Sequence, residues 1–204
     1  MTATLAASGL TVFRGDRCLF RDLDFALDAG ELLLLEGRNG SGKSTLLRAI
    51  LGLIDVDSGD VLWNGALVRD HRQAFHACVV WLAHRVGFKA DLTLVENLRF
   101  EAALKSRARR DLQAVLERLD IDRLKRLPLR ALSAGQQRRV ALARMLLADA
   151  MLWMLDEPFT NLDREGRDLV LELVSEHLEA GGMCIMTAHQ DVNLDVPMHR
   201  IQLQ

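Results

Sequence analysis

The feature that most constrains this chain is a glycine-rich loop between an apolar strand and a helix. The run 32–35 predicts a strand buried on both faces, and a helix is expected over about 42–53. The loop fits the pattern GxxxxGK[ST], in which glycines let successive backbone N–H groups turn toward phosphate oxygens at a helix start. The expected phosphate-binding residues are Gly37, Arg38, Asn39, Gly40, Ser41, Gly42, Lys43, Ser44 and Thr45.

Several polar side chains near this loop have separate expected roles. Lys43 is expected to reach the β- and γ-phosphates of a nucleotide, and the Ser44 hydroxyl to ligate Mg²⁺. A second apolar strand, expected over 151–155, ends in Asp156 and Glu157. A parallel sheet would place Asp156 near the Mg²⁺ and Glu157 near the γ-phosphate, where it serves as the general base for water.

Length and composition limit the class of protein. The 204 residues are 50% hydrophobic and 26% charged, which is typical of one compact globular domain. The net charge of -2 does not indicate nonspecific nucleic-acid binding, so no nucleic-acid partner is expected. Three scattered cysteines, an N-terminus unlike a signal peptide and apolar runs too short for a bilayer favour a soluble or peripheral intracellular protein.

The order of expected elements indicates an α/β fold with a mixed sheet. Alternating apolar and polar residues predict N-terminal antiparallel strands over 4–12 and 19–27. The stretch 72–130 is mostly helical in pattern and charge-rich, which is typical of a helical subdomain inserted into the core. We therefore expect a single domain over 1–204, with a core of about 1–71 and 131–204 and a helical lobe of about 72–130.

A short motif before the next helix separates the classes of phosphate-loop protein. Ser133-x-x-Gln136 has the spacing of a capping box, so an ordinary helix start explains it equally well. The run Leu-Ser-Ala-Gly-Gln, 132–136, also resembles the LSGGQ signature of ATP-binding-cassette (ABC) ATPases. The resemblance implies ATP and Mg²⁺ as cofactors and a homodimer or paired cassette subunit. In that dimer the signature of one subunit caps the γ-phosphate bound by the other, here through Ser133, Ala134, Gly135 and Gln136.

Two later segments resemble further motifs of the ABC family. The run 160–163 resembles the D-loop, which implies that Asp163 lies at the dimer interface. His189 follows a strand expected over 183–187 and resembles the switch histidine, which contacts the γ-phosphate and holds the attacking water. The resemblance thus implies catalytic roles for Glu157 and His189.

The chain departs from the family pattern at two positions. An aromatic ring ordinarily stacks on adenine, and the candidate here is Phe13, with Arg14 in competition for the aligned position. The glutamine of the Q-loop is replaced by Arg85. A fixed cation near Mg²⁺ opposes the metal, so we expect Arg85 to alter coupling or turnover.

Segments outside the shared motifs resemble the haem-exporter ATPases of cytochrome c maturation, notably 84–100, 132–144, 155–160 and 181–183. The resemblance implies an ATP-hydrolysing subunit bound peripherally at the cytoplasmic face of the inner membrane, with integral-membrane permease subunits that handle haem. Alternatives from the sequence are the ATPase of another ABC transporter, a soluble ABC ATPase without a permease, a nonhydrolytic regulatory subunit and a phosphate-loop kinase.

Overall fold

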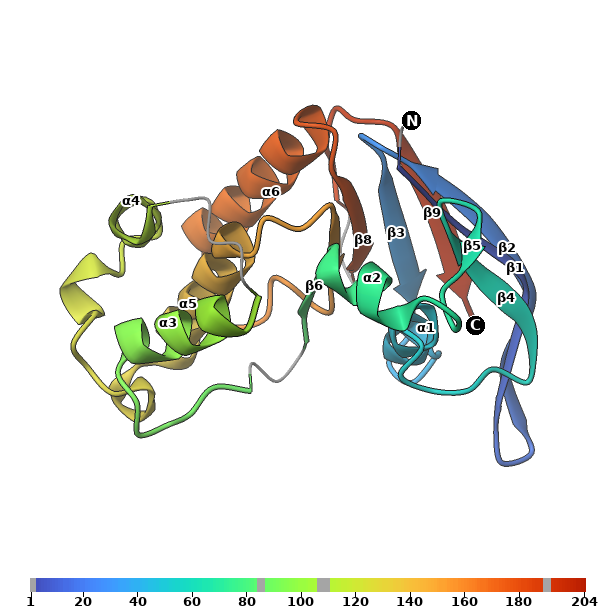
Figure 1. The fold of residues 1–204 in the computed structure, drawn as a ribbon, viewed down its shortest axis with the longest axis horizontal. Helices are drawn as coiled ribbons and strands as arrows, with labels where there is room; N and C mark the ends of the chain where they lie inside the picture. Colours follow the sequence, from blue (N-terminus) through green and yellow to red (C-terminus); the bar gives the residue numbers. More distant parts are fainter. Residues whose placement is uncertain (1–2, 84–86, 106–110, 189–191) are drawn as a thin grey trace.

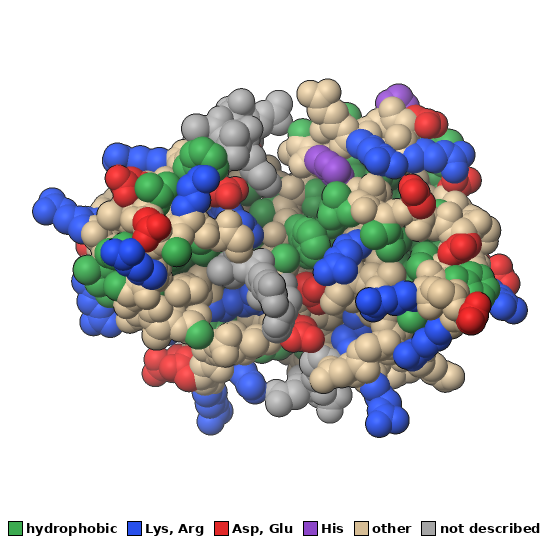
Figure 2. Space-filling model, turned by 90° about the horizontal axis from the view of Figure 1, so that it is seen from below, with side chains coloured by type: hydrophobic (Ala, Val, Ile, Leu, Met, Phe, Trp, Pro, Cys, Tyr) green, Lys and Arg blue, Asp and Glu red, His purple; other side chains and the backbone are tan. Residues whose placement is uncertain are grey.

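The structure is a computed structural model that describes residues 3–83, 87–105, 111–188 and 192–204, with the backbone alone for 102–105. Figure 1 shows the antiparallel strands on one side of the parallel strands and the helices α3, α4 and α5 on the other. Figure 2 views the molecule from below and shows basic and acidic side chains interspersed over that face. Among the described residues, no helix combines the length and apolar character that a bilayer crossing requires.

The centre of the fold is a five-stranded parallel sheet. Its strand order is β6 (Val79–Leu82), β7 (Leu152–Leu155), β8 (Met183–Thr187), β3 (Leu32–Gly37) and β9 (Met198–Leu203). Both β3 and β7 pair with β8, so they are separated by one strand. Their carboxyl ends therefore open at the same edge of the sheet, where ligands bind in α/β proteins.

The second sheet is antiparallel and has the order β2 (Arg17–Asp28), β1 (Thr4–Arg14), β4 (Ser58–Trp63) and β5 (Ala66–Leu67). The alternating residues of the first two strands predicted this hairpin, although both strands extend beyond the expected bounds. Their inward residues pack against the parallel sheet. The expected α/β core with N-terminal antiparallel strands is therefore what the structure contains.

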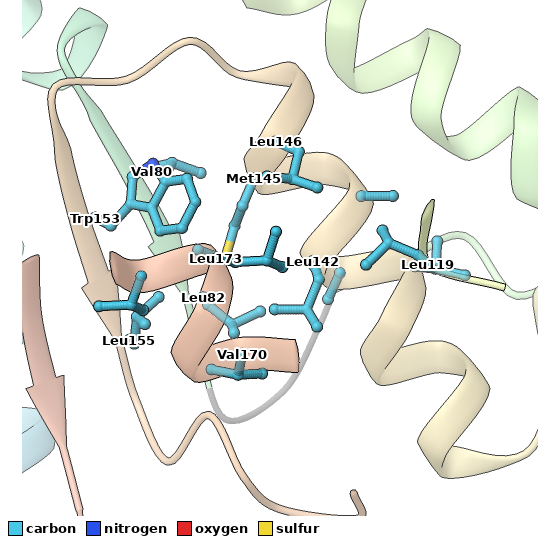
Figure 3. Close-up of a cluster of buried hydrophobic side chains, with 14 of the residues drawn as sticks. Val80, Leu82, Leu119, Leu142, Met145, Leu146, Trp153, Leu155, Val170 and Leu173 are labelled. Atoms are coloured by element: carbon cyan, nitrogen blue, oxygen red, sulfur yellow. The ribbon is translucent and has the colours of Figure 1, made fainter. Parts of the chain in front are cut away.

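The apolar run of β3 is explained by burial on both faces of the sheet. Leu32 and Leu34 belong to the hydrophobic cluster beneath α5 and α6, whereas Leu33 and Leu35 belong to the cluster beneath the antiparallel sheet and α1. All four side chains are fully buried. Figure 3 shows the first cluster, in which residues of β6 and β7 meet α5 and α6: Val80, Leu82, Trp153, Leu155, Leu142, Met145, Leu146, Val170 and Leu173.

The helices surround this core at bounds close to those expected. Two capping boxes form: the spacing Thr-x-x-Glu predicts the one at Thr93 and Glu96 that begins α3, and the one at Ser133 and Gln136 begins α5. Gly52, with φ +64°, follows the first helix and ends it earlier than expected. The helices are α1 (Lys43–Ile50), α2 (Arg72–Ala77), α3 (Leu94–Lys105), α4 (Leu112–Arg118), α5 (Ala134–Leu147) and α6 (Arg164–Glu179), with short 3₁₀ turns at Asp122–Leu124 and Leu129–Ala131.

One segment of the expected helical stretch 72–130 is a strand. Residues Val79–Leu82 form β6, which pairs in register with β7 and so extends the parallel sheet. A four-residue apolar run has no period that separates a strand from a buried helix. The pairing partner decides it, and that partner lies more than 70 residues later in the chain.

Candidate nucleotide-binding and catalytic site

The phosphate loop, residues 37–45, leaves β3 and enters α1 through three glycines with positive φ. These are Gly37 at +144°, Gly40 at +80° and Gly42 at +105°. A Cβ atom on Gly37 would lie 2.4 Å from the carbonyl oxygen of Leu203 and 2.6 Å from Ser41 Oγ. The loop therefore needs glycine at this position both for its backbone angles and for space.

Lys43 lies folded into this loop. Its ammonium group donates to the carbonyl oxygens of Gly37 at 2.7 Å and Arg38 at 3.1 Å, and the side chain is buried. Burial lowers the pKa of Lys43, while the negative charges of Glu157 and Asp156 oppose that shift. The cation and both predicted carboxylates thus belong to one electrostatic site.

Ser44 and Asp156 meet as the sequence predicted. Ser44 Oγ lies 3.1 Å from Asp156 Oδ1, although 112 residues separate them. Asp156 is buried and also accepts a hydrogen bond from the Thr187 hydroxyl at 3.3 Å. A hydroxyl and a carboxylate side by side are oxygen donors of the kind that hard divalent cations bind.

Glu157 occupies the next position, in a strained backbone conformation. Its φ is +50°, which is uncommon for a residue with a side chain. The backbone N–H of Glu157 donates to Thr187 Oγ1 at 2.7 Å, and Thr160 Oγ1 donates to Glu157 Oε2 at 3.4 Å. The side chain is half-buried beside the buried Asp156.

The signature residues form the first turn of α5. The Ser133 hydroxyl accepts from the N–H of Gln136 at 3.2 Å, and the Gln136 side chain accepts from the N–H of Ser133 at 2.9 Å. Gly135 packs so closely on the D-loop that a Cβ atom there would lie 2.9 Å from the carbonyl oxygen of Asn161. Ala134 is exposed and helical, which explains why an alanine is accommodated where the family pattern has glycine.

The signature turn and the D-loop line one polar pocket. Asp163 is the N-cap of α6 and accepts from the N–H of Gly166 at 2.9 Å. No residue of the phosphate loop lines this pocket, so the signature and the phosphate loop of one chain do not form a common site. The lining residues, all within the described part of the chain, are Asp120, Arg123, Ser133, Gly135, Gln136, Arg139, Asn161, Leu162 and Asp163.

Phe13, the candidate for adenine stacking, is 39% exposed at the end of β1. Its N–H donates to Asp57 Oδ2 at 2.8 Å, and the Arg21 guanidinium carbon lies 5.8 Å from the centre of its ring. Arg14 is also exposed. The remaining predicted positions, Arg85 and His189, lie outside the described residues.

Two residues of this site escaped the sequence reasoning. Thr187 is fully buried at the end of β8 and contacts both Asp156 and Glu157. Arg138 of α5 is also buried, and its guanidinium reaches the backbone around those two acids. A sequence signal exists for Arg138, because it shares the helical spacing i, i+3, i+4, i+7 with the apolar residues at 141, 142 and 145.

Comparison with known proteins identifies the family. The family model described as "ABC transporter" matches residues 20–160, more than half of the chain. The chain belongs to the ABC transporter family. It is 43% identical over 199 residues to the cytochrome c biogenesis ATP-binding export protein CcmA of Vibrio vulnificus strain YJ016, covering 96% of this chain and 97% of that protein. The CcmA protein of Methylococcus capsulatus is also 43% identical and covers 94% of each chain.

Solved structures confirm the fold. An ABC transporter ATP-binding protein from Pyrococcus furiosus superposes with a TM-score of 0.84 at 24% identity, over 98% of this chain and 97% of that one. An ATP-binding subunit of an ABC transporter superposes with a TM-score of 0.83 at 26% identity, over 91% of this chain and 79% of that one. The predicted ABC ATPase fold and the resemblance to the cytochrome c maturation ATPases are thereby confirmed.

Proposed function

We propose that this chain is the ATP-hydrolysing subunit of a membrane ABC transporter complex that exports or delivers haem for c-type cytochrome biogenesis. The observation that carries the proposal is the meeting of Lys43, Ser44, Asp156 and Glu157 at one sheet edge. The similarity to CcmA proteins over nearly the whole chain supports the cytochrome c assignment. It also favours this reading over the other ABC transporters and the soluble ABC ATPases.

The phosphate loop is the proposed ATP site. Its backbone N–H groups and the start of α1 would bind phosphate oxygens, and Lys43 would exchange its carbonyl partners for the β- and γ-phosphates. Ser41 supports this assignment, because its buried hydroxyl has no hydrogen-bond partner among the described residues. A buried polar group of that kind costs free energy unless a ligand satisfies it.

Ser44 and Asp156 fit a Mg²⁺ site. Mg²⁺ in nucleotide sites takes one or two protein oxygens together with phosphate oxygens and water, which matches a hydroxyl and a carboxylate 3.1 Å apart. The metal would neutralise charge on the phosphates during phosphoryl transfer. Asp156 accepts a hydrogen bond from the Thr187 hydroxyl, which fixes the carboxylate orientation.

Glu157 is the proposed general base. Its carboxylate would accept a proton from the attacking water while the water oxygen forms a bond to the γ-phosphorus. The bond from that phosphorus to the β–γ bridging oxygen would break, which releases ADP and inorganic phosphate. The Thr160 hydroxyl donates to the side chain of Glu157, and the Thr187 hydroxyl accepts from the backbone N–H of Glu157. His189 is proposed to hold the same water, on the strength of its sequence position.

The active unit is proposed to be a dimer, of two copies of this chain or of this chain with a paired cassette. Ser133, Gly135 and Gln136 of the signature line a pocket that contains no phosphate-loop residue. The start of α5, which attracts anions, would therefore bind the ATP of a second subunit. Asp163, at the start of α6 in the same pocket, is proposed to lie at that interface.

A permease partner completes the proposal. An export protein needs a path through the bilayer, so this subunit would bind peripherally at the cytoplasmic face of the inner membrane. Because the similar CcmA proteins are named as export proteins of cytochrome c biogenesis, haem is the proposed cargo, held by the membrane subunits.

Phe13, with Arg21 beside it, is proposed to stack on adenine.

The catalytic part is tested by comparing Glu157→Gln with Glu165→Gln in purified protein. Glu165 is an exposed glutamate in the first turn of α6 and serves as a matched control. We expect Glu157→Gln to lower kcat by about 10²- to 10⁴-fold while ATP still binds, and Glu165→Gln to change it little. Equal activity of the two variants would contradict the role of Glu157.

The transport part is tested by extracting a tagged chain from membranes in mild detergent and identifying what co-purifies. Multi-spanning subunits that contain haem would support the proposal. A permease without haem would retain the ATPase assignment and refute the cargo. Recovery of the active ATPase without any membrane subunit would refute the transporter role.

A further inference from the structure

Arg138 contacts the backbone of residues 156–158, the turn directly after β7 that contains Glu157 and is called the catalytic turn below. Its Nη2 donates to the carbonyl oxygens of Glu157 at 2.6 Å and Asp156 at 3.2 Å, and its Nε donates to that of Pro158 at 3.1 Å. A fourth bond runs from Nη1 to the carbonyl oxygen of Ala83 at 3.2 Å, just beyond β6. One guanidinium therefore binds three successive carbonyls of the turn and the end of a neighbouring strand.

The burial of Arg138 makes these bonds strong determinants of local structure. The residue is only 4% exposed. An arginine guanidinium stays charged at neutral pH. A buried charge must be hydrogen-bonded, so the carbonyls of the turn are held where the guanidinium can reach them.

The turn that Arg138 holds contains a strained residue. Glu157 has φ +50°, and such a conformation persists only when surrounding contacts enforce it. Arg138 binds the carbonyl of Glu157, while Thr187 Oγ1 accepts from its N–H at 2.7 Å. The direction of the Glu157 side chain follows from its backbone angles, so these two contacts together aim the carboxylate.

The neighbours of Arg138 on α5 face other parts of the molecule. Gln137 Nε2 donates to the carbonyl oxygens of Leu129 and Leu132, ahead of the signature. Arg139 Nη1 donates to the carbonyl oxygen of Leu119, after α4. Because α5 begins at the signature, the same rigid helix presents the signature turn at its start and Arg138 on its flank.

We propose that Arg138 is a positioning residue that couples the seating of the signature helix to the orientation of Glu157. A displacement of α5 would move the guanidinium and, through the three carbonyls, the backbone that aims the general base. Hydrolysis would then be fast only when α5 is seated against the turn. This inference rests on the proposed ATPase function and adds a residue for which neither the motifs nor the family comparison provides a role.

The test compares substitutions of two buried arginines on the same helix. Arg138→Met removes all four hydrogen bonds, whereas Arg138→Lys keeps the charge on one ammonium group that cannot reach all four carbonyl oxygens. Arg144→Met is the matched control, because Arg144 is also largely buried but donates to the carbonyl oxygen of Trp81 in β6. Each variant is measured for kcat, KM, affinity for the fluorescent analogue TNP-ATP, and melting temperature.

We expect Arg138→Met to lower kcat by about 10- to 100-fold, because a misplacement of about 1 Å suffices for such a loss. KM and the affinity for TNP-ATP should stay within about twofold of the parent values, and Arg138→Lys should recover part of the rate. Arg144→Met should lower the melting temperature comparably but change kcat by less than about twofold.

Two outcomes would overturn the inference. One is an unchanged kcat in Arg138→Met. The other is a fall in kcat that tracks the melting temperature alike in Arg138→Met and Arg144→Met, because that pattern is a general loss of stability. Glu157→Gln separates this inference from the proposed function. If Glu157→Gln retains full activity, Glu157 is not the general base and the proposed function is refuted. If Glu157→Gln is inactive, the result for Arg138→Met decides the inference about Arg138.

Discussion

In the variant Gly135→Ala, two effects on the free energy of unfolding oppose each other: a gain from backbone entropy and a loss from steric overlap with the D-loop. Replacing a helical glycine by alanine normally stabilises a protein by about 0.5–1 kcal/mol, because glycine loses more backbone entropy on folding. In this structure, however, the new Cβ atom would lie 2.9 Å from the carbonyl oxygen of Asn161. An ordinary carbon–oxygen contact is several tenths of an ångström longer, so the D-loop or α5 must move.

We expect the steric effect to exceed the entropic one. Overpacking of this kind costs about 1–3 kcal/mol, so subtracting the entropic gain leaves a net loss of about 1 kcal/mol, and at most about 2.5 kcal/mol, for Gly135→Ala. For a chain of this size, a loss of about 1 kcal/mol lowers Tm by about 2–4 °C. The displaced D-loop also leads back to Thr160, which donates to Glu157, so ATPase activity should fall by more than the loss of folded protein explains.

The assay is thermal unfolding together with steady-state ATP hydrolysis on Gly135→Ala, with Ala114→Gly as the control. Ala114 is exposed in α4, outside the signature, so its replacement should cost only the glycine propensity, about 0.5–1 kcal/mol, and leave kcat nearly unchanged. A higher Tm with unchanged activity in Gly135→Ala would refute the reasoning, because it would show that no steric contact opposes the helix propensity.

Three further predictions concern Thr187, Glu96 and Arg85. Thr187→Val keeps the shape of the side chain but removes the hydrogen bonds to Asp156 and to the N–H of Glu157. We expect kcat to fall while TNP-ATP still binds, and a kcat equal to that of the parent protein would contradict this. Hydrogen bonds from Thr93 lower the pKa of Glu96, so its stabilising effect is complete at neutral pH and lost as the pH falls below about 4. Acid unfolding of Glu96→Gln should therefore be less steep than that of the parent, and equal slopes would contradict this. From the sequence alone, Arg85 occupies the Q-loop position, where a cation would oppose Mg²⁺, so Arg85→Gln is predicted to raise ATPase activity. An unchanged or lower rate in purified protein counts against it.

Local sequence patterns predicted the parts of this protein that depend on neighbouring residues. The phosphate loop follows from glycine spacing between an apolar strand and a helix, and the structure shows positive φ at Gly37, Gly40 and Gly42. Both capping boxes formed as expected, because their hydrogen bonds join residues only three positions apart. Parallel pairing of two strands to a common neighbour also made the meeting of Ser44 and Asp156 predictable.

The strand β6, inside the stretch 72–130 that the sequence pattern predicts to be mostly helical, shows where local patterns reach their limit. β6 is short and uniformly apolar, and only its pairing with β7 makes it a strand. The end of the first helix also differs from the expected bound. The apolar periodicity continues to about residue 53, but α1 ends at Ile50, close before Gly52, which has positive φ.

The sequence by itself determined the glycine-rich loop and which carboxylates lie beside it, because glycine angles, capping and strand patterns act over a few residues. Only the tertiary structure decided that Gly135 has no room for a methyl group, that Thr187 holds both acids and that Arg138 binds the catalytic turn. Each of these depends on backbone atoms from a distant part of the chain, such as the carbonyl oxygens of Asn161 and Glu157. Carbonyl oxygens are common to every residue type, so the sequence carries no mark of which one a side chain will meet, and only packing brings the two together.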